Sequence, residues 1–406
     1  MNERTKEFIR DRFRKYYHST SIQLPSRFEQ REWGFIFFDE SFPDIVMRRH
    51  KSFMTAWEAI DYLRTMVPAH AFHSAAYYMS PGAPSMEEKG WQGADLIFDI
   101  DADHLPIKWT TYGEMLQRTK EELLKLLGFL REDFAIAEDD IEIVFSGGRG
   151  YHIHVRDSRL IGLGSPERRE IVDYVKGPDM GQFFEKKKGS EEGANGRKKA
   201  YKRFEVKYGG GGWDGRINKS IVGFVDAIRQ MPKDKALEFL MSYESFKKRR
   251  SAEEFFDMFQ DERRIQLIKE RGTIDILRGS EKFWRSLIEE SIKRESISMD
   301  MPSIDIGKGT PDEPVTADVK RLIRLPTSIH GGYGFRVTPL TPEELGVFNP
   351  LSDAIVFGDD LIRVNVTKKS DVEIKDNRYV LKRGKKSLPE HLAIFLMCRG
   401  AAEYEP

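Results

Sequence analysis

The sequence predicts a mixed α/β fold of the α+β type that carries a smaller, mostly helical insertion. Two outer regions, residues 1–165 and 300–406, alternate helix-like periodicity with short strand-like apolar runs. Residues 166–299 show few strand signals and many charged, helix-like stretches. A chain of 406 residues with 39% hydrophobic residues can bury a full core. We therefore expect one domain from the two outer regions and a second from residues 166–299.

The periodicity of apolar residues places the expected elements along the chain. It predicts helices over residues 3–18, 56–66 and 112–130, and from about Pro389. It predicts strands over residues 33–38, 94–102, 141–145, 151–155, 329–340, 353–357, 361–366 and 379–383. In the middle region, the lysine-rich run 185–203 and the glycine-rich run 208–215 are typical of exposed loops.

Composition excludes several classes of function. Sixty-six basic residues balance sixty-six acidic ones, so the whole chain has no electrostatic bias towards nucleic acid, although local basic patches are compatible with that balance. The single cysteine, Cys398, excludes a disulfide framework, and the apolar run around it predicts burial. No apolar run approaches the ~18 residues of a membrane span, and the N-terminus is highly charged, so we expect a cytoplasmic protein without a membrane partner.

Asp99 and Asp101 are the first candidate catalytic residues. Side chains two apart on a strand face the same way, so these carboxylates lie on one side and Leu96, Phe98 and Ile100 on the other. Neighbouring carboxylates repel each other unless a cation lies between them, and Mg²⁺ or Mn²⁺ prefers such oxygen ligands. A strand end that reaches solvent needs no metal, so this pattern alone leaves both interpretations open.

The stretch SGGRGYHIHV, residues 146–155, predicts a glycine turn between two strands. In that arrangement His152 and His154 project from one face. The backbone N–H groups of a glycine turn and an arginine guanidinium suit a triphosphate, so Ser146, Arg149 and His152 are candidate phosphate-binding residues. A solvated hairpin and a zinc site are the alternatives, and zinc is the weaker because no third ligand stands close in sequence.

A third cluster lies in residues 311–337. It contains Asp312, the cations Lys320, Arg321 and Arg324, and His330 before a second glycine-rich turn. A charge run of this kind is usually the solvated face of a helix. Together with the two earlier motifs, however, it supplies acids for metal ions and cations for a triphosphate, which are the requirements of phosphoryl-group chemistry.

The motifs FDIDAD (98–103), SGGRGYHIHV and RLIRLPTSIHGGYGFRV together resemble the small catalytic subunit of archaeal and eukaryotic DNA primases, most closely the archaeal form. The order and separation of the motifs fit that family, and residues 31–53 are similar to its N-terminal basic motif. The resemblance covers most of residues 1–160 and 300–405. It implies a primase catalytic core of mixed α/β structure with a smaller helical insertion.

The resemblance also implies roles for individual residues. Asp99, Asp101 and Asp312 would be the catalytic acids that bind two metal ions, Mg²⁺ or Mn²⁺. The implied nucleotide-binding residues are Ser146, Arg149, His152, Arg324, His330 and, in the N-terminal motif, Arg49. Many relatives carry a zinc knuckle after the DxD strand, but residues 104–130 contain His104 and no cysteine, so no thiolate zinc site is expected. Either ordinary packing closes this loop, or the site is missing with its subdomain.

The function implied by the resemblance is template-directed nucleotidyl transfer. Such a DNA primase subunit makes short primers for replication on single-stranded DNA, from NTPs or dNTPs, by two-metal catalysis. The resemblance further implies a heterodimer with a large, regulatory primase subunit. Two alternatives stay open: a non-catalytic nucleic-acid-binding subunit whose acids are structural, and a metal-dependent phosphohydrolase.

Overall fold

The computed structural model of the chain divides into two compact units. Unit 1 comprises Met1–Leu105, Trp109–Val172 and Thr310–Pro406, and unit 2 comprises the described residues of Asp173–Gly309. Residues 184–192 and 198–206 are described by their backbone alone. The described residues are 1–39, 42–43, 46–105, 109–177, 184–192, 198–206, 211–243, 246, 248–271, 274, 282–284, 286–287 and 308–406.

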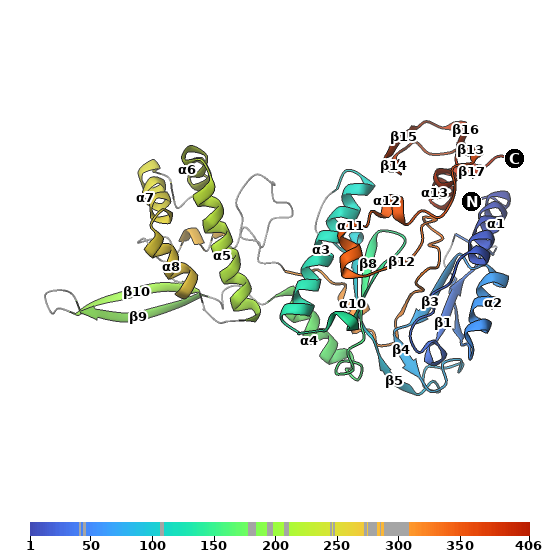
Figure 1. Cartoon of the computed structure of the whole chain (residues 1–406), viewed down its shortest axis with the longest axis horizontal. Coiled ribbons are helices and arrows are strands. Elements are labelled where there is room, and N and C mark those ends of the chain that lie inside the picture. Colours follow the sequence, from blue (N-terminus) through green and yellow to red (C-terminus); the bar gives the residue numbers. More distant parts are fainter. Residues whose placement is uncertain are drawn as a thin grey trace. The chain divides into compact units, whose positions relative to one another are not determined.

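Unit 1 combines helices with antiparallel sheets, which confirms the predicted mixed α/β class (Figure 1). Its helices are α1 (Glu3–Ser19), α2 (Ala56–Met66), α3 (Tyr112–Glu132), the start of α4 (Ser165–Lys176), α10 (Glu313–Ala317), α11 (Pro342–Val347), α12 (Pro350–Asp353) and α13 (Glu390–Cys398). Its strands are β1 (Trp33–Ile36), β2 (Arg48–Lys51), β3 (His70–Ser74), β4 (Ala76–Tyr78), β5 (Trp91–Ala94), β6 (Leu96–Asp101), β7 (Ile141–Phe145), β8 (Gly150–Val155), β11 (Leu322–Arg324), β12 (Thr338–Leu340), β13 (Leu361–Val366), β14 (Ser370–Ile374), β15 (Asn377–Leu381), β16 (Gly384–Pro389) and β17 (Ala402–Tyr404).

Two four-stranded sheets position the candidate site. One has the strand order β12-β7-β8-β6, and the other has the order β11-β3-β1-β2. Helix α3 packs on β6 and β8 of the first sheet. The short helix α10 packs on β6, where Ile97, Val315 and Ile323 share one apolar cluster. Each sheet therefore joins strands from before and after unit 2 in the sequence.

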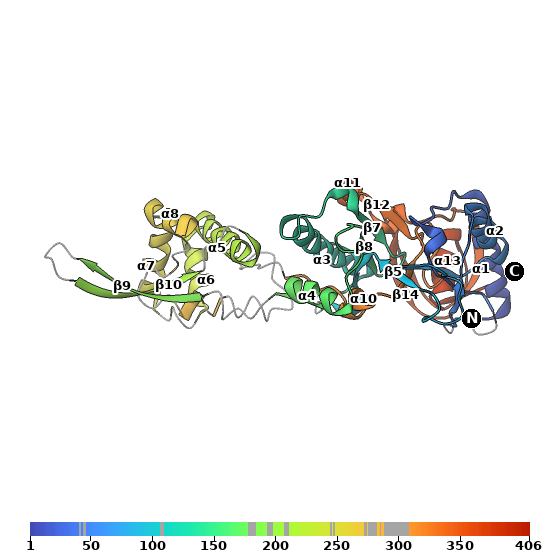
Figure 2. The same cartoon turned by 90° about the horizontal axis from the view of Figure 1, so that it is seen from below.

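The C-terminal part of unit 1 forms a third sheet, β16-β13-β17, and a hairpin of β14 and β15. Helix α13 is buried along most of its length, because the run LAIFLM is apolar on every face. It packs side by side with α1 (Figure 1, Figure 2). This arrangement brings Cys398, at the end of α13, into the interior of unit 1, as predicted from its apolar run.

Unit 2 contains the helices α5 (Gly212–Gln230), α6 (Lys233–Met241), α7 (Arg249–Phe259) and α8 (Glu262–Arg271). Aromatic rings of Phe224, Phe255 and Trp284 pack together in its core. Strands β9 (Phe184–Glu192) and β10 (Lys198–Val206) pair as an antiparallel hairpin, so the prediction of a loop over 185–203 is wrong at these positions. Strands pair through their backbone groups and need no apolar run, so the charged residues gave no sign of either strand.

Two further strand predictions are wrong in unit 1. Residues 353–357 form no strand, because Asn349 caps the short helix α12 and a turn follows it. Residues 329–337 make only the isolated bridge between Ile329 and Arg336, since the glycine-rich turn interrupts pairing until β12 begins. No helix among the described residues is long and apolar enough to cross a membrane.

Candidate active site

Asp99 and Asp101 lie at the C-terminal end of β6, where the strand approaches the protein surface. β6 pairs antiparallel with β8, and this register places Asp99 opposite His152. The Nε2 atom of His152 lies 3.4 Å from Oδ1 of Asp99, and both side chains are largely buried. The ring of His154 lies behind that of His152, with 6.4 Å between the centroids. Because His154 pairs with Ile97 in the same register, His152 and His154 project from one face of the sheet, as predicted.

The turn between β7 and β8 depends on its glycines. Gly147 adopts φ +75°, which favours glycine, and a Cβ there would meet the Cβ of His330 at 2.8 Å. The turn closes through Ser146, whose N–H donates to the carbonyl oxygen of Gly150 at 2.9 Å and whose Oγ accepts from the Gly150 N–H at 3.3 Å. The glycines thus let the turn approach His330 from a distant part of the chain.

Asp312 joins this group from the start of α10. Its N–H donates to the carbonyl oxygen of Asp99 at 3.0 Å, which fixes the two chain segments to each other. The Oδ2 atom of Asp312 lies 3.3 Å from Nδ1 of His104, which follows the DxD strand. The three predicted acids therefore come from two adjacent segments of unit 1.

The environment of Asp99 disfavours its charged form. Burial, together with the carboxylates of Asp101 and Asp312, raises the pKa of Asp99 to about 7. Nearby Arg321 and Arg324 lower this pKa only in part. Asp99 therefore gains and loses its proton close to neutral pH. A divalent cation would compete with that proton for the carboxylate.

This raised pKa predicts how stability depends on pH. The folded state holds the Asp99 proton more tightly than the unfolded state does, so the free energy of unfolding should fall as pH rises from about 4 through about 7. In a metal chelator at about pH 8, Asp99→Asn should stabilise the protein by about 4 kcal/mol, and the gain should vanish below about pH 4. Thermal melting against pH measures both, and a gain that persists in acid would contradict this origin.

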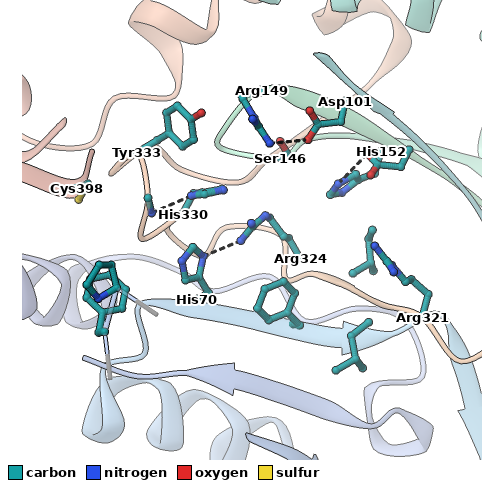
Figure 3. A pocket seen from close by; sticks show the side chains of 17 residues that line it. His70, Asp101, Ser146, Arg149, His152, Arg321, Arg324, His330, Tyr333 and Cys398 are labelled. Atoms are coloured by element: carbon teal, nitrogen blue, oxygen red, sulfur yellow. Dashed lines mark hydrogen bonds and ion pairs between the residues drawn. The ribbon is translucent and has the colours of Figure 1, made fainter. Parts of the chain in front are cut away.

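A cavity of about 420 Å³ opens beside these acids, within the range of small-molecule sites (Figure 3). Asp101, Arg149 and His152 face it from one side, and His70 and Arg324 face it from the other. The predicted residues that line it are Asp99, Asp101, Ser146, Arg149, His152, Arg324 and His330. Seven of the nine predicted site residues thus share one cavity, and Asp312 adjoins it through Asp99.

The cations of the cavity keep their charge while its histidines are neutral. Burial lowers the pKa of Arg324 to about 10, which leaves the guanidinium protonated at neutral pH. The Nη1 atom of Arg324 lies 2.8 Å from Nδ1 of His70, and burial lowers the pKa of His70 and of His330 well below the usual value. On the opposite wall, Arg149 pairs with Asp103 and lies 3.6 Å from Asp101.

Arg49 does not reach this cavity. Its guanidinium binds both carboxylate oxygens of the buried Glu32, at 3.0 Å each, on the edge strand β2. Sequence reasoning also missed His70 and Tyr333, which both line the cavity. The signal for His70 was its place in HAFHS, which puts two of the chain's nine histidines on one buried strand. Tyr333 lies within the glycine-rich turn that was already noted.

The donor set suits a hard divalent cation. Among the described residues, no group of three or more His, Cys, Asp or Glu side chains is arranged to hold a metal ion. Burial and, after it, the negative charges of Asp101 and Asp312 nevertheless raise the pKa of Asp99, so part of this rise is repulsion among the three carboxylates. A bound Mg²⁺ or Mn²⁺ would remove this repulsion, and carboxylate oxygens are the ligands that such ions prefer. The chemistry of these residues therefore fits the implied metal ions.

Comparison with known proteins shows the family of the chain. Residues 98–342 match the family described as DNA primase small subunit. The chain is 47% identical to the DNA primase small subunit PriS of Methanocella arvoryzae, over 100% of both chains. It is 42% identical to that of Methanococcoides burtonii, again over 100% of both, and 44% identical to that of Methanothrix thermoacetophila, over 99% of this chain and 100% of the relative. The similarity includes the middle region, which the motifs did not cover.

Proposed function

Because the chain belongs to the family of DNA primase small subunits, we propose that it is the catalytic subunit of a DNA primase. It would synthesise short primers on single-stranded DNA from NTPs or dNTPs and would work as a heterodimer with a large primase subunit. The observation that carries this proposal is a single cavity lined by the carboxylates of Asp99 and Asp101 and by the guanidinium groups of Arg149 and Arg324. A nucleoside triphosphate needs both kinds of group.

In the proposed reaction, a 3′-hydroxyl attacks the α-phosphate of a nucleoside triphosphate, and pyrophosphate leaves. Asp99, Asp101 and Asp312 would hold two Mg²⁺ or Mn²⁺ ions. When bound, these ions supply Lewis-acid stabilisation of the attacking and leaving oxygens.

The remaining cavity residues would hold the triphosphate. Arg149 and Arg324 offer charged donors to its oxygens, and Arg324 keeps its charge at neutral pH despite burial. His152 and His330 are neutral, so each can offer one N–H without adding charge. Ser146, at the glycine turn, would approach the same phosphates. Arg49 would contribute only indirectly, by holding Glu32 and the N-terminal motif in place.

Primer synthesis on single-stranded DNA tests this proposal. The chain is incubated with template, labelled NTPs or dNTPs and Mg²⁺ or Mn²⁺, with and without the large subunit, beside an Asp99→Ala/Asp101→Ala variant. We expect template-dependent oligonucleotides from the wild type and none from the variant. Phosphate release without oligonucleotides would favour a phosphohydrolase, and DNA binding without any reaction would favour a non-catalytic subunit.

A further inference from the structure

The C-terminal β-structure of unit 1 is strongly basic. Residues 361–386 contain nine lysines and arginines against three acids, in a chain whose formal charge is zero. The feature lies outside the motifs that predicted the active site. Basic character confined to one surface indicates an anionic partner there, even in a neutral chain.

The strand register brings four of these cations together. Pairing of β13 with β16 ends at Val366 and Gly384, and pairing of β14 with β15 begins at Ser370 and Leu381. The two connections between these strand pairs, residues 367–369 and 382–383, therefore face each other. They contribute Lys368, Lys369, Lys382 and Arg383, which we name the junction cluster. All four side chains are exposed.

The junction cluster differs from its neighbours in having no acidic partner. Within the described part of the chain, none of its four side chains forms an ion pair, whereas Arg378 pairs with Asp371 and Lys385 pairs with Glu405. Uncompensated like charges on facing connections repel each other, and a polyanion laid across them removes that repulsion. The cluster is therefore suited to several negative charges rather than to one carboxylate.

Two backbone hydrogen bonds and one cation–π contact link the junction cluster to the active-site cavity. The N–H groups of Thr367 and Lys368 both donate to the carbonyl oxygen of Ala401, at 2.8 and 3.2 Å. Two residues earlier, the exposed guanidinium of Arg399 lies over the ring of Tyr333, 4.8 Å from its centroid, and Tyr333 lines the cavity. Arg399 therefore lies beside the cavity wall and two residues along the chain from the point where the junction cluster is bonded.

We infer that the junction cluster binds the sugar–phosphate backbone of the nucleic acid on which the cavity acts, with Arg399 between the two. The inference rests on the proposed primase function and adds a surface to it. Lysine and arginine contacts to phosphates hold a strand without reading its sequence, which a primase requires of its template. Because the cluster cations have no acidic partner, they can pair with the regularly spaced phosphates of such a strand.

A matched pair of double variants tests this inference. Lys382→Gln/Arg383→Gln removes two cluster charges, and Arg378→Gln/Lys385→Gln removes two ion-paired charges from the same sheet and hairpin. We expect the first to weaken binding of a labelled oligothymidylate by about tenfold at ~0.1 M salt, and to lower the slope of log affinity against log salt by about 1.4. The second should change neither quantity appreciably. Fluorescence anisotropy across salt concentrations provides both measurements.

Comparing oligothymidylate with a primed template distinguishes the two sources of phosphate. A loss confined to the single strand assigns the cluster to the template, and a loss confined to the primed template assigns it to the product duplex. Equal effects of the two variants, or loss of large-subunit binding with unchanged DNA binding, would overturn the inference. Failure of the primase proposal would show separately, as wild-type protein that binds DNA but makes no primer.

Discussion

Replacing Asp312 by asparagine is expected to lower the rate of primer synthesis by at least about a thousandfold. Asparagine keeps the size of the side chain and one of its oxygens but removes the negative charge. Asp312 does not line the cavity, yet its N–H is bonded to Asp99 and its charge helps to raise the pKa of Asp99. Single-nucleotide extension of a primed template measures the loss, with kcat and KM determined separately.

His104→Gln is the control for this substitution. It removes the imidazole whose Nδ1 lies 3.3 Å from Asp312 and leaves the carboxylate in place, and a half-exposed contact of this kind contributes at most about 1 kcal/mol. We therefore expect less than about a fivefold loss of activity. Equal losses in the two variants would mean that Asp312 acts through His104. A readout independent of activity is the pH dependence of stability, which Asp312→Asn should shift towards acid because Asp99 loses a repelling neighbour.

Gly150→Ala is expected to damage both stability and activity. A Cβ at this position would lie 2.2 Å from the carbonyl oxygen of Ile100 and 3.0 Å from Cα of Asp101. Both are backbone atoms of the neighbouring strand, so no side chain can rotate away and β6 and β8 must separate. We expect unfolding to become easier by about 3 kcal/mol, with a melting temperature lower by several degrees.

Gly162→Ala provides the matched control, since a Cβ there meets nothing within 4 Å and φ is not in the left-handed region. Its melting temperature should stay close to that of the wild type. Because Gly150 is paired with Asp101, the Gly150→Ala protein should also lose metal-dependent activity at temperatures where it remains folded. A folded Gly150→Ala protein with full activity would show that the separation of β6 from β8 does not move the acids.

Local patterns were sufficient to predict much of this site. The alternation in β6 and β8 is set by burial of Phe98 and Ile153 on one face, which leaves Asp99 and His152 on the other. The glycine turn could also be predicted from local sequence, since glycine favours the positive φ that Gly147 adopts. The helices α1, α2 and α3 begin at or next to the expected residues, because capping and periodicity are also local signals.

Features that depend on distant pairing could not be predicted in this way. His70 reaches the cavity because β3 pairs with β11, a contact between the N-terminal and C-terminal parts of unit 1. Arg49 belongs to the N-terminal motif, yet its full hydrogen bonding to the buried Glu32 depends on packing that the motif does not encode. The hairpin of β9 and β10 is similar, since charged residues give no periodic sign of pairing.

The hydrogen bond between Asp312 and Asp99 joins two segments that lie on either side of unit 2 in the sequence. This order has a consequence for protein synthesis. The ribosome makes β3, β6, β7 and β8 early, and then makes all of residues 173–309 before α10, β11 and β12 appear. At ordinary rates of translation this interval lasts on the order of ten seconds. Throughout it, β3 and β7 are unpaired sheet edges, which tend to associate with other chains. A nascent chain that stops before Asp312 would therefore be both inactive and prone to aggregate.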